Sequence, residues 1–177
     1  KEDRTYEDVA SKFFEHFIAI ADAINHFGGT GLWDEDDGFY YDRIRSADAA
    51  VPLKVRSLVG IIPLFAVHVL DEEVIARLPG FTKRMNWFLE NRTDLAQYIA
   101  YMEQGRRKDH SHAHRLLAIP SRTRLERLLH YVLDEREFLS PYGVRSLSRV
   151  HLEHPYTCHV GEKTYTVRYT PAESDST

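Results

Sequence analysis

Residues 5–27 read TYEDVASKFFEHFIAIADAINHF and contain the most regular pattern in the chain. Five apolar side chains recur there at spacings of three and four, Val9, Phe13, Phe17, Ile20 and Ile24. This periodicity predicts one apolar stripe along an α-helix. Thr5 followed by Asp8 resembles a capping box, and Gly28-Gly29 ends the pattern. The sequence therefore predicts a helix from about Thr5 to Phe27.

Further helices are expected along the chain. Phe81, Met85, Phe88 and Leu89 indicate a helix from about Gly80 to Asn91. The apolar stretch Val55 to Leu70 contains Pro63, and proline is tolerated in a first helical turn, so we expect a helix to start near it. Residues 71–78 are expected to form a short turn or helix. Ser121 to Leu133 has an apolar face and a plausible N-cap serine, which predicts another helix.

Two stretches favour hairpins, and for the first of them a loop is the alternative. In residues 31–42, GLWDEDDGFYYD, the acidic run ends at Gly38 and the following aromatic residues favour extended chain. Near the end, Thr157 to Val160 and Thr164 to Tyr169 flank Gly161-Glu162-Lys163, which predicts a β-hairpin.

The composition is that of a soluble globular domain. Of 177 residues, 43% are hydrophobic and 28% are charged, which excludes wholesale disorder. The net charge of -4 gives no basic footprint for nucleic acid. The longest apolar run, Leu58 to Leu70, is too short to span a bilayer. Cys158 is the single cysteine and forms no internal disulfide, so a cytoplasmic location is expected.

The acidic aromatic stretch carries the residue types that bind and cleave sugars. Glycoside hydrolysis uses two carboxylates, and sugar binding uses carboxylates with a flat aromatic ring. The candidate binding residues here are Trp33, Asp34, Tyr40, Tyr41 and Asp42. If Trp33 is a stacking platform, Trp33→Ala weakens sugar binding. The alternative is a solvated acidic turn. A helix-loop-helix calcium site is set aside, because counting from Asp34 puts Phe39 where the glycine belongs.

Two other clusters are candidates for chemistry. His110, His112 and His114 alternate in a polar loop, and such histidines bind zinc or nickel when they share a strand face. A solvated loop is the simpler interpretation, and no metal or other cofactor is expected.

In residues 140–148, SPYGVRSLS, the side chains of Tyr142, Arg145 and Ser146 have the chemistry to contact a sugar. A structural turn with Arg145 in an internal ion pair explains that stretch equally well.

Three long motifs resemble one known family in the same order. They are GLWDEDDGFYYD at 31–42, VRSLVGIIPLFA at 55–66 and FLSPYGVRSLS at 138–148. Each is similar to a stretch of bacterial glucosidase-like proteins related to glycoside hydrolase family sixty-three, the mannosyl-oligosaccharide glucosidases, and to mannosylglycerate hydrolases. With the first helix and the closing residues 169–174, the likeness covers nearly the whole chain.

This resemblance implies a mainly α fold, a partial (α/α)6 toroid with long loops and a small β-hairpin. Residues 1–177 would form part of one catalytic domain, an internal fragment that packs against the remainder of that domain. The family's inverting mechanism needs an acid and a base on either side of a water. No position here matches either group, so both are expected outside this fragment, and the fragment alone is expected to be inactive.

Two functions from different classes follow. The first is a fragment of an α-glucosidase-like glycoside hydrolase that acts on α-glucosides or related sugars. The alternative is a non-catalytic helical module that binds carbohydrate or another protein. Sugar binding is common to both, so hydrolysis is what separates them.

Overall fold

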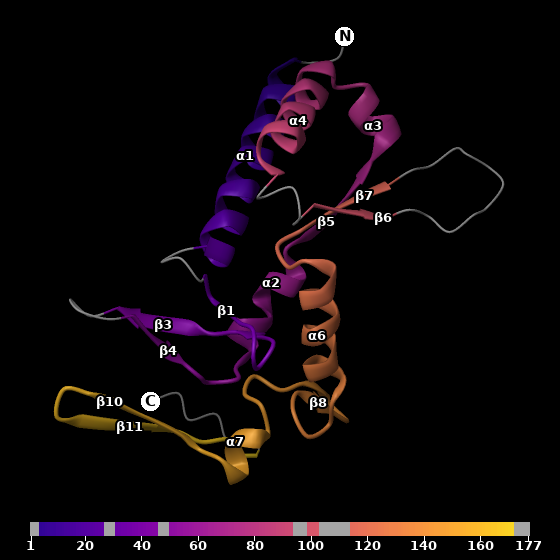
Figure 1. Ribbon diagram of the computed structural model, residues 1–177. Helices are drawn as coiled ribbons and strands as arrows, with labels where there is room; N and C mark the ends of the chain where they lie inside the picture. The colour runs from indigo at the N-terminus through magenta and orange to yellow at the C-terminus, as the bar shows by residue number, and fades with distance from the viewer. Residues whose placement is uncertain (1–3, 27–30, 46–49, 94–98, 103–113, 172–177) are drawn as a thin grey trace. The chain divides into compact units, whose positions relative to one another are not determined.

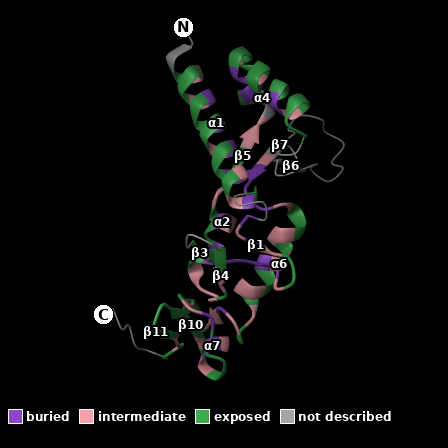
Figure 2. Cartoon of the chain, turned by 60° about the vertical axis from the view of Figure 1, so that its left-hand side comes forward, coloured by how far each residue is buried: buried purple, intermediate pink, exposed green. Residues whose placement is uncertain are grey.

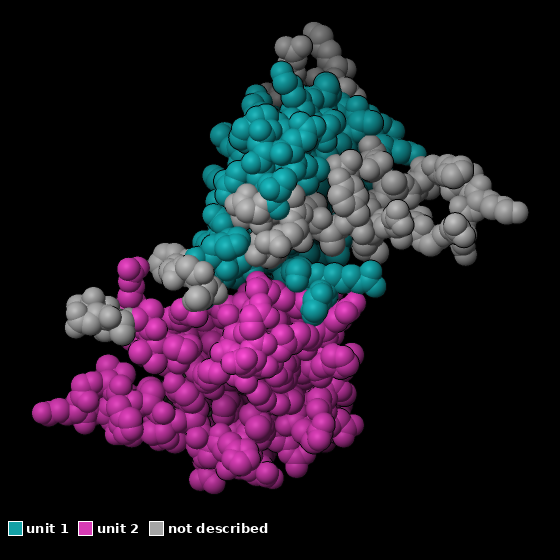
Figure 3. All heavy atoms as spheres, in the orientation of Figure 1, with its two compact units in different colours: residues 1–31, 63–123 teal, residues 32–62, 124–177 magenta. Residues whose placement is uncertain are grey.

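The computed structural model describes residues 4–26, 31–45, 50–93, 99–102 and 114–171. The chain divides into two compact units, coloured separately in Figure 3. Unit 1 consists of residues 1–31 and 63–123, and unit 2 consists of residues 32–62 and 124–177. Each unit is therefore built from two stretches of sequence, with a stretch of the other unit between them.

Unit 1 contains two long helices and a three-stranded antiparallel sheet. Helices α1 (Arg4–His26) and α4 (Pro79–Asn91) lie side by side (Figure 1). The sheet has the order β5-β7-β6. Its strands are β5 (Val67–Asp71), β6 (Ile99–Met102) and β7 (His114–Ala118). The short helix α3 (Glu72–Ala76) follows β5 directly. Asp71 is its N-cap, and the Asp71 side chain accepts a hydrogen bond from the Glu73 N–H.

The core of unit 1 is aromatic. The ring of Phe14 on α1 meets Phe81 and Phe88 on α4 edge to face, with ring centroids 5.5 and 5.7 Å apart. Glu7 on α1 accepts a hydrogen bond from the Phe81 N–H at 2.9 Å, which satisfies one of the free donors at the start of α4. The remaining members of the buried cluster are Ile18, Ile75, Met85 and Leu117.

Helix α1 buries a different face from the one that the sequence indicates most strongly. Its predicted bounds are confirmed to within a residue. Of the predicted apolar stripe, however, Val9, Phe13 and Ile20 are exposed in the structure. The side chains that are buried instead come from a second stripe, Ser11, Phe14, Ile18, Ala21 and Asn25. The exposed face of α1 (Figure 2) also carries apolar side chains, so periodicity alone could not choose between the two faces.

Unit 2 is built from short hairpins and helix α6 (Arg122–Leu133), most of which belongs to this unit. All of its sheets have two antiparallel strands among the described residues. The pairs are β1 (Trp33–Asp34) with β2 (Phe39–Tyr40), β3 (Asp42–Arg45) with β4 (Ala50–Leu53), β8 (Leu139–Ser140) with β9 (Gly143–Val144), and β10 (Tyr156–Val160) with β11 (Lys163–Val167). Helix α7 (Val150–Glu153) is a single turn.

The core of unit 2 forms where these hairpins meet. Phe39, Ile61, Leu128 and Phe138 are fully buried. The rings of Phe39 and Phe138 stack with an interplanar angle of 7° and centroids 6.0 Å apart. Gly60 lies in the 3-10 helix η2 (Leu58–Ile61), and a Cβ at this position would collide with the Phe39 ring and the Tyr40 carbonyl. A glycine is therefore what lets η2 approach the β1–β2 hairpin so closely.

The expectation of a mainly α fold and a partial (α/α)6 toroid is wrong. The described part of the chain is mixed α/β, with five small antiparallel sheets spread between its helices. The segment expected to form a helix from Pro63 gives one clear reason. Helix α2 covers only Ile62–Phe65, and the chain then enters β5, where the β-branched Val67 and Val69 favour extended chain. A toroid needs consecutive helix pairs, and strands replace them here.

Several local predictions are confirmed. Helices α4 and α6 lie within a residue of their expected positions, and α3 lies within residues 71–78. The acidic stretch forms the β1–β2 hairpin, and the closing hairpin is β10–β11. None of the helices within the described ranges is long and apolar enough to cross a membrane.

Candidate functional site

The three motifs lie apart in the sequence, and their residues 32–42, 55–62 and 138–148 come together in unit 2. Ser57 forms an isolated antiparallel bridge with Leu147, between the second and third motifs. The Leu58 N–H donates to the Ser146 carbonyl, and the Ser148 N–H donates to the Arg56 carbonyl, both at 2.8 Å. The first motif joins them through the Phe39–Phe138 ring stack. These contacts make the three motifs one structural assembly.

The acidic hairpin is an ordered turn. The Asp37 N–H donates to the Asp34 carboxylate at 2.9 Å, and the Gly38 N–H donates to the Asp34 carbonyl at 2.8 Å. Gly38 has a φ of 67°, a left-handed conformation that suits glycine. The Tyr131 hydroxyl on α6 donates to the Asp37 carbonyl. The turn is thus fixed by its own hydrogen bonds and by α6.

Lys54 forms ion pairs with two carboxylates of this turn. Its Nζ lies 2.9 Å from an Asp34 carboxylate oxygen and 3.1 Å from an Asp37 carboxylate oxygen. The pKa of Asp34 is lowered, first by the hydrogen bond from the Asp37 N–H and then by Lys54. The pKa of Lys54 is raised, because both carboxylates bind its ammonium form.

Arg56 occupies the centre of a second polar network. Its Nη1 lies 2.6 Å from the Glu137 carboxylate, and its Nε–H donates to the Tyr41 hydroxyl at 3.3 Å. The guanidinium also lies over the Tyr131 ring, 4.9 Å from the centroid. Glu137 accepts a further hydrogen bond from the Ser148 hydroxyl. The side chains of Arg56 and Glu137 are only 22% and 13% exposed, so both charges are largely removed from water.

His151 completes this network and has one defined tautomer. Its Nε2 accepts a hydrogen bond from the Arg56 N–H at 2.9 Å, and its Nδ1 lies 3.1 Å from the His154 carbonyl. A carbonyl accepts only, so Nδ1 carries the proton and Nε2 does not. The ring is 5% exposed, which makes it a fixed structural histidine.

Trp33 lies against cationic side chains. Two guanidiniums from α6 lie over its ring, Arg124 at 4.9 Å and Arg127 at 5.5 Å from the centroid. The indole N–H faces the Glu35 carboxylate without a hydrogen bond of normal geometry. The pKa of Glu35 is lowered, first by this indole and then by Arg124, which binds it at 2.9 Å. At 4% exposure, Trp33 has no open ring face in this conformation.

The predicted site residues divide into a buried group and an exposed group. Trp33, Tyr40 and Tyr41 are buried, and Asp34 is paired with Lys54. The exposed group comprises Asp42, Tyr142 and Ser146. Arg145 lies between these groups in exposure. Its guanidinium donates hydrogen bonds to the backbone carbonyls of Glu135, Glu137 and Leu139 and to the Tyr169 hydroxyl. These partners are neutral groups, whereas the structural explanation expected from the sequence was an internal ion pair.

The turn that carries Tyr142 is rigid. The Ser140 hydroxyl donates to the Gly143 carbonyl at 2.8 Å and accepts from the Tyr142 N–H at 3.2 Å. The β8–β9 ladder closes the same turn through Ser140 and Gly143. The Tyr142 side chain is 99% exposed. An aromatic ring is thereby presented to solvent on a fixed support.

Two carboxylates of unit 2, Asp34 and Glu35, are held as anions. Asp34 and Glu35 both have a lowered pKa, whereas a general acid needs a raised one. Among the described residues, no three His, Cys, Asp or Glu side chains gather as a metal site would require. His110 and His112 lie outside the described residues, as does the side chain of His114.

Sequence reasoning missed the Arg56–Glu137–His151 network. Arg56 lies inside the second motif, and Glu137 directly precedes the third. The two are 81 positions apart, and no local pattern links residues at that separation. In the sequence, the position of each residue in or beside a motif was the signal that could have identified it.

Comparison with known proteins gives one informative match. No family model matches the sequence, and no solved structure matches it. The chain is 44% identical, over 193 aligned positions, to an uncharacterized protein of Saccharomyces cerevisiae, YMR196W. The match includes 99% of this chain and 17% of the yeast protein. The chain therefore spans about one sixth of the length of this relative and is similar to a part of a much longer protein.

Proposed function

We propose that this chain is a segment of a glycoside hydrolase that acts on α-glucosides or related sugars by inversion. In this proposal the segment contributes sugar-contacting surface, and the acid and base belong to other parts of the enzyme. It needs no cofactor and acts in the cytoplasm, as its single cysteine favours. The supporting observation is that the three glucosidase-like motifs assemble around one core in unit 2.

In this proposal, the packed side chains of the assembly hold the third motif in place, and the third motif exposes the sugar-contacting residues. The partly buried Arg56–Glu137 pair and the Phe39–Phe138 stack fix the third motif against the other two. The third motif then presents Tyr142 on its rigid turn, with the exposed Ser146 hydroxyl in the same motif. A tyrosine ring stacks on the C–H face of a pyranose, and a hydroxyl binds its polar edge. Tyr142 is thus the residue to test as a sugar platform.

A non-catalytic carbohydrate-binding segment is the second candidate. The lowered pKa values of Asp34 and Glu35 agree with both candidates, because neither carboxyl is prepared to donate a proton at neutral pH and neither candidate places the acid in this chain. Both candidates share the sugar-binding surface, so binding alone does not distinguish them.

Two measurements test the proposal. The complete yeast relative is incubated with a panel of α-glucosides and with mannosylglycerate, and the first anomer released is identified by NMR. Hydrolysis with inversion supports the glycosidase, and absence of hydrolysis on every substrate overturns it. Binding of maltotriose to the 177-residue chain is measured by calorimetry. Tyr142→Ala is expected to weaken that binding at least tenfold, about 1.4 kcal/mol.

The matched control for the binding measurement is Tyr165→Ala. Tyr165 is also an exposed tyrosine on a hairpin of unit 2, at 51% exposure. It should leave the affinity unchanged. Equal losses in the two variants would reject Tyr142 as the platform.

A further inference from the structure

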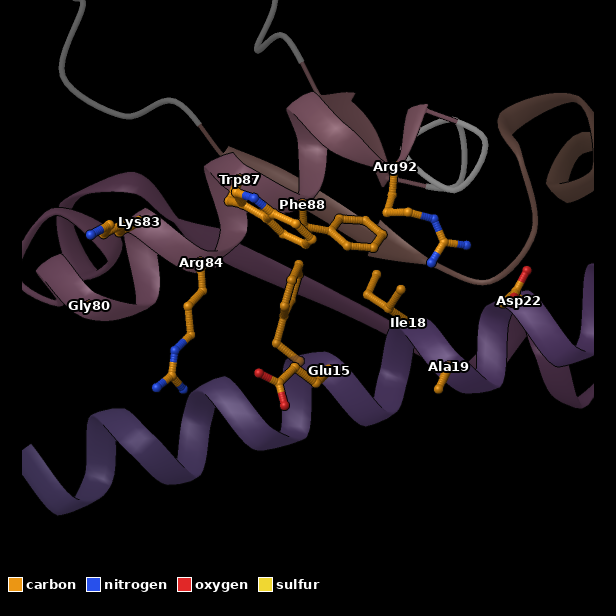
Figure 4. Close-up of a pocket in the computed structure, with 11 residues that line it drawn as sticks. Glu15, Ile18, Ala19, Asp22, Gly80, Lys83, Arg84, Trp87, Phe88 and Arg92 are labelled. Atoms are coloured by element: carbon orange, nitrogen blue, oxygen red, sulfur yellow. The ribbon is translucent and has the colours of Figure 1, made fainter.

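A groove of about 630 Å³ lies between α1 and α4 inside unit 1 (Figure 4). Its floor is apolar and includes Phe14, Ile18 and Phe88, which are between 6% and 9% exposed. The volume falls within the range of small-molecule sites in proteins. None of the three motifs contributes to this groove, so it is separate from the assembly in unit 2.

Trp87 is the most unusual residue of the groove. It is 60% exposed, although it is one of the two largest apolar side chains of the chain. Figure 4 shows its indole beside the Phe88 ring, on the α4 wall of the groove. An exposed indole above an aromatic floor offers a flat face for a ring-shaped ligand.

The rim of the groove carries charges of both signs on opposite walls. Glu15 and Asp22 line it from α1, and Arg84 and Arg92 line it from α4 or its end. The members of each pair are seven or eight positions apart, two helical turns, so they share a face. Figure 4 shows Arg84 and Arg92 flanking the Trp87–Phe88 pair and reaching toward α1. One wall therefore accepts hydrogen bonds and the other donates them.

Three of these charged groups, Glu15, Asp22 and Arg84, keep hydrogen-bonding capacity for a ligand. Glu15 pairs with Lys12 at 2.7 Å, Asp22 with His26 at 2.8 Å, and Arg84 with Asp8 at 3.6 Å. A carboxylate has about four lone-pair sites and a guanidinium has five N–H donors, so one such contact does not saturate either group.

A second groove in unit 1 has a more apolar lining, although His16, His68 and Asp71 also contribute to it. It has a volume of about 640 Å³ and is lined mainly by hydrophobic side chains, among them Phe13, Phe17, Ile20 and Val69. The α1–α4 groove shares the apolar floor and differs in its donor and acceptor walls. Its occupant should therefore have apolar faces and hydroxyl-bearing edges.

A pyranose ring has this combination of surfaces. We propose that the α1–α4 groove binds a pyranose unit of an oligosaccharide, with Trp87 stacked on its C–H face. Glu15 and Asp22 accept hydrogen bonds from its hydroxyls, and Arg84 and Arg92 donate to its oxygens. The sugar class rests on the proposed function, whereas the groove and its residues do not.

Tryptophan fluorescence tests the site directly in the 177-residue chain. The chain has two tryptophans, Trp33 at 4% exposure and Trp87 at 60%. The long-wavelength emission typical of a solvent-exposed indole therefore comes from Trp87. Titration with maltotriose to about 10 mM should move the emission to shorter wavelength, with saturation. Trp87→Ala should abolish this shift. Sorbitol, which has the hydroxyls without the ring, should produce none.

The controls separate this site from its alternatives. Phe13→Ala removes an aromatic that is 70% exposed on the same helix but outside the groove, and it should leave the shift intact. Arg84→Gln and Asp22→Asn should each weaken binding several-fold, with circular dichroism confirming the fold. Absence of a saturable shift overturns the proposal. Emission that depends on protein concentration and not on maltotriose also overturns it, since the groove would then bind another copy of the chain.

The two proposals fail independently. Tyr142→Ala should leave the Trp87 emission shift unchanged. In the Trp87→Ala background, where the groove no longer binds maltotriose, Tyr142→Ala should still weaken the binding seen by calorimetry at least tenfold. Loss of only the emission shift rejects the groove in unit 1 and leaves the proposed function standing.

Discussion

Arg56 and Glu137 form an ion pair with 2.6 Å between Nη1 and Oε1, although they lie 81 positions apart in the sequence. The pair links the second motif to the residue that precedes the third. Because both side chains are mostly buried, removing one leaves the other charge without compensation. The pair is therefore expected to decide whether unit 2 stays assembled.

Glu137→Gln should lower the free energy of unfolding by about 2 kcal/mol, the range for a hydrogen bond to a charged group. The amide keeps the shape but loses the charge that faces Arg56. Urea unfolding followed by Trp33 fluorescence measures the effect in unit 2. The control is Glu135→Gln, because Glu135 is exposed. Similar losses in the two variants would contradict a special role for the Glu137 pair.

Acid should weaken unit 2 through Asp34. Its folded pKa lies below the ordinary value of 3.8, so the stabilisation is present above about pH 4 and is lost as the pH falls through the folded pKa. Asp34→Asn cannot titrate and should show a shallower fall in the urea midpoint below pH 4. Identical acid profiles for the variant and the parent would refute this assignment.

Alkali should act through Tyr41. Burial raises the pKa of Tyr41 from 10.0 to about 12, which favours the neutral phenol in the folded state. Its contribution to stability is complete below pH 10 and is lost as the pH rises toward 12. Phenolate absorbance of the folded chain should show a late-titrating component that Tyr41→Phe reduces. A late component that is unchanged in Tyr41→Phe would contradict this assignment.

Trp33→Ala should act on stability. Its side chain is 4% exposed and lies beneath two guanidiniums, so truncation should cost about 3–5 kcal/mol of unfolding free energy. Calorimetry on the fraction that remains folded should give an unchanged affinity for maltotriose. A selective loss of affinity with an unaltered melting temperature would restore Trp33 as a sugar platform.

The sequence predicted the local elements of this protein better than their assembly. Local periodicity and turn residues can be recognised within a single stretch of sequence. They predicted helices α1, α4 and α6 and the two hairpins. The toroid failed because it required the segment after Pro63 to remain helical, whereas Val67 and Val69 formed strand β5. The buried face of α1 was equally undetermined, since the helix has apolar residues on both sides.

The candidate site shows the same division. The acidic hairpin was found at its predicted position, yet its aromatic rings turned inward and became core. Aromatic residues fill cores as readily as they bind sugars, so composition cannot separate these roles. The Arg56–Glu137 pair was not predicted, because only the tertiary structure brings these two residues together.

The division of unit 2 into two stretches has a consequence for its synthesis. Phe39 cannot stack on Phe138 until 99 further residues have been made, and translation at 5–20 residues per second makes this delay about 5–20 s. During that interval the aromatic hairpin lacks its core partner, while residues of unit 1 are being produced. Transiently exposed apolar surface promotes aggregation, so slowing translation within residues 63–123 should increase the aggregation of the nascent chain.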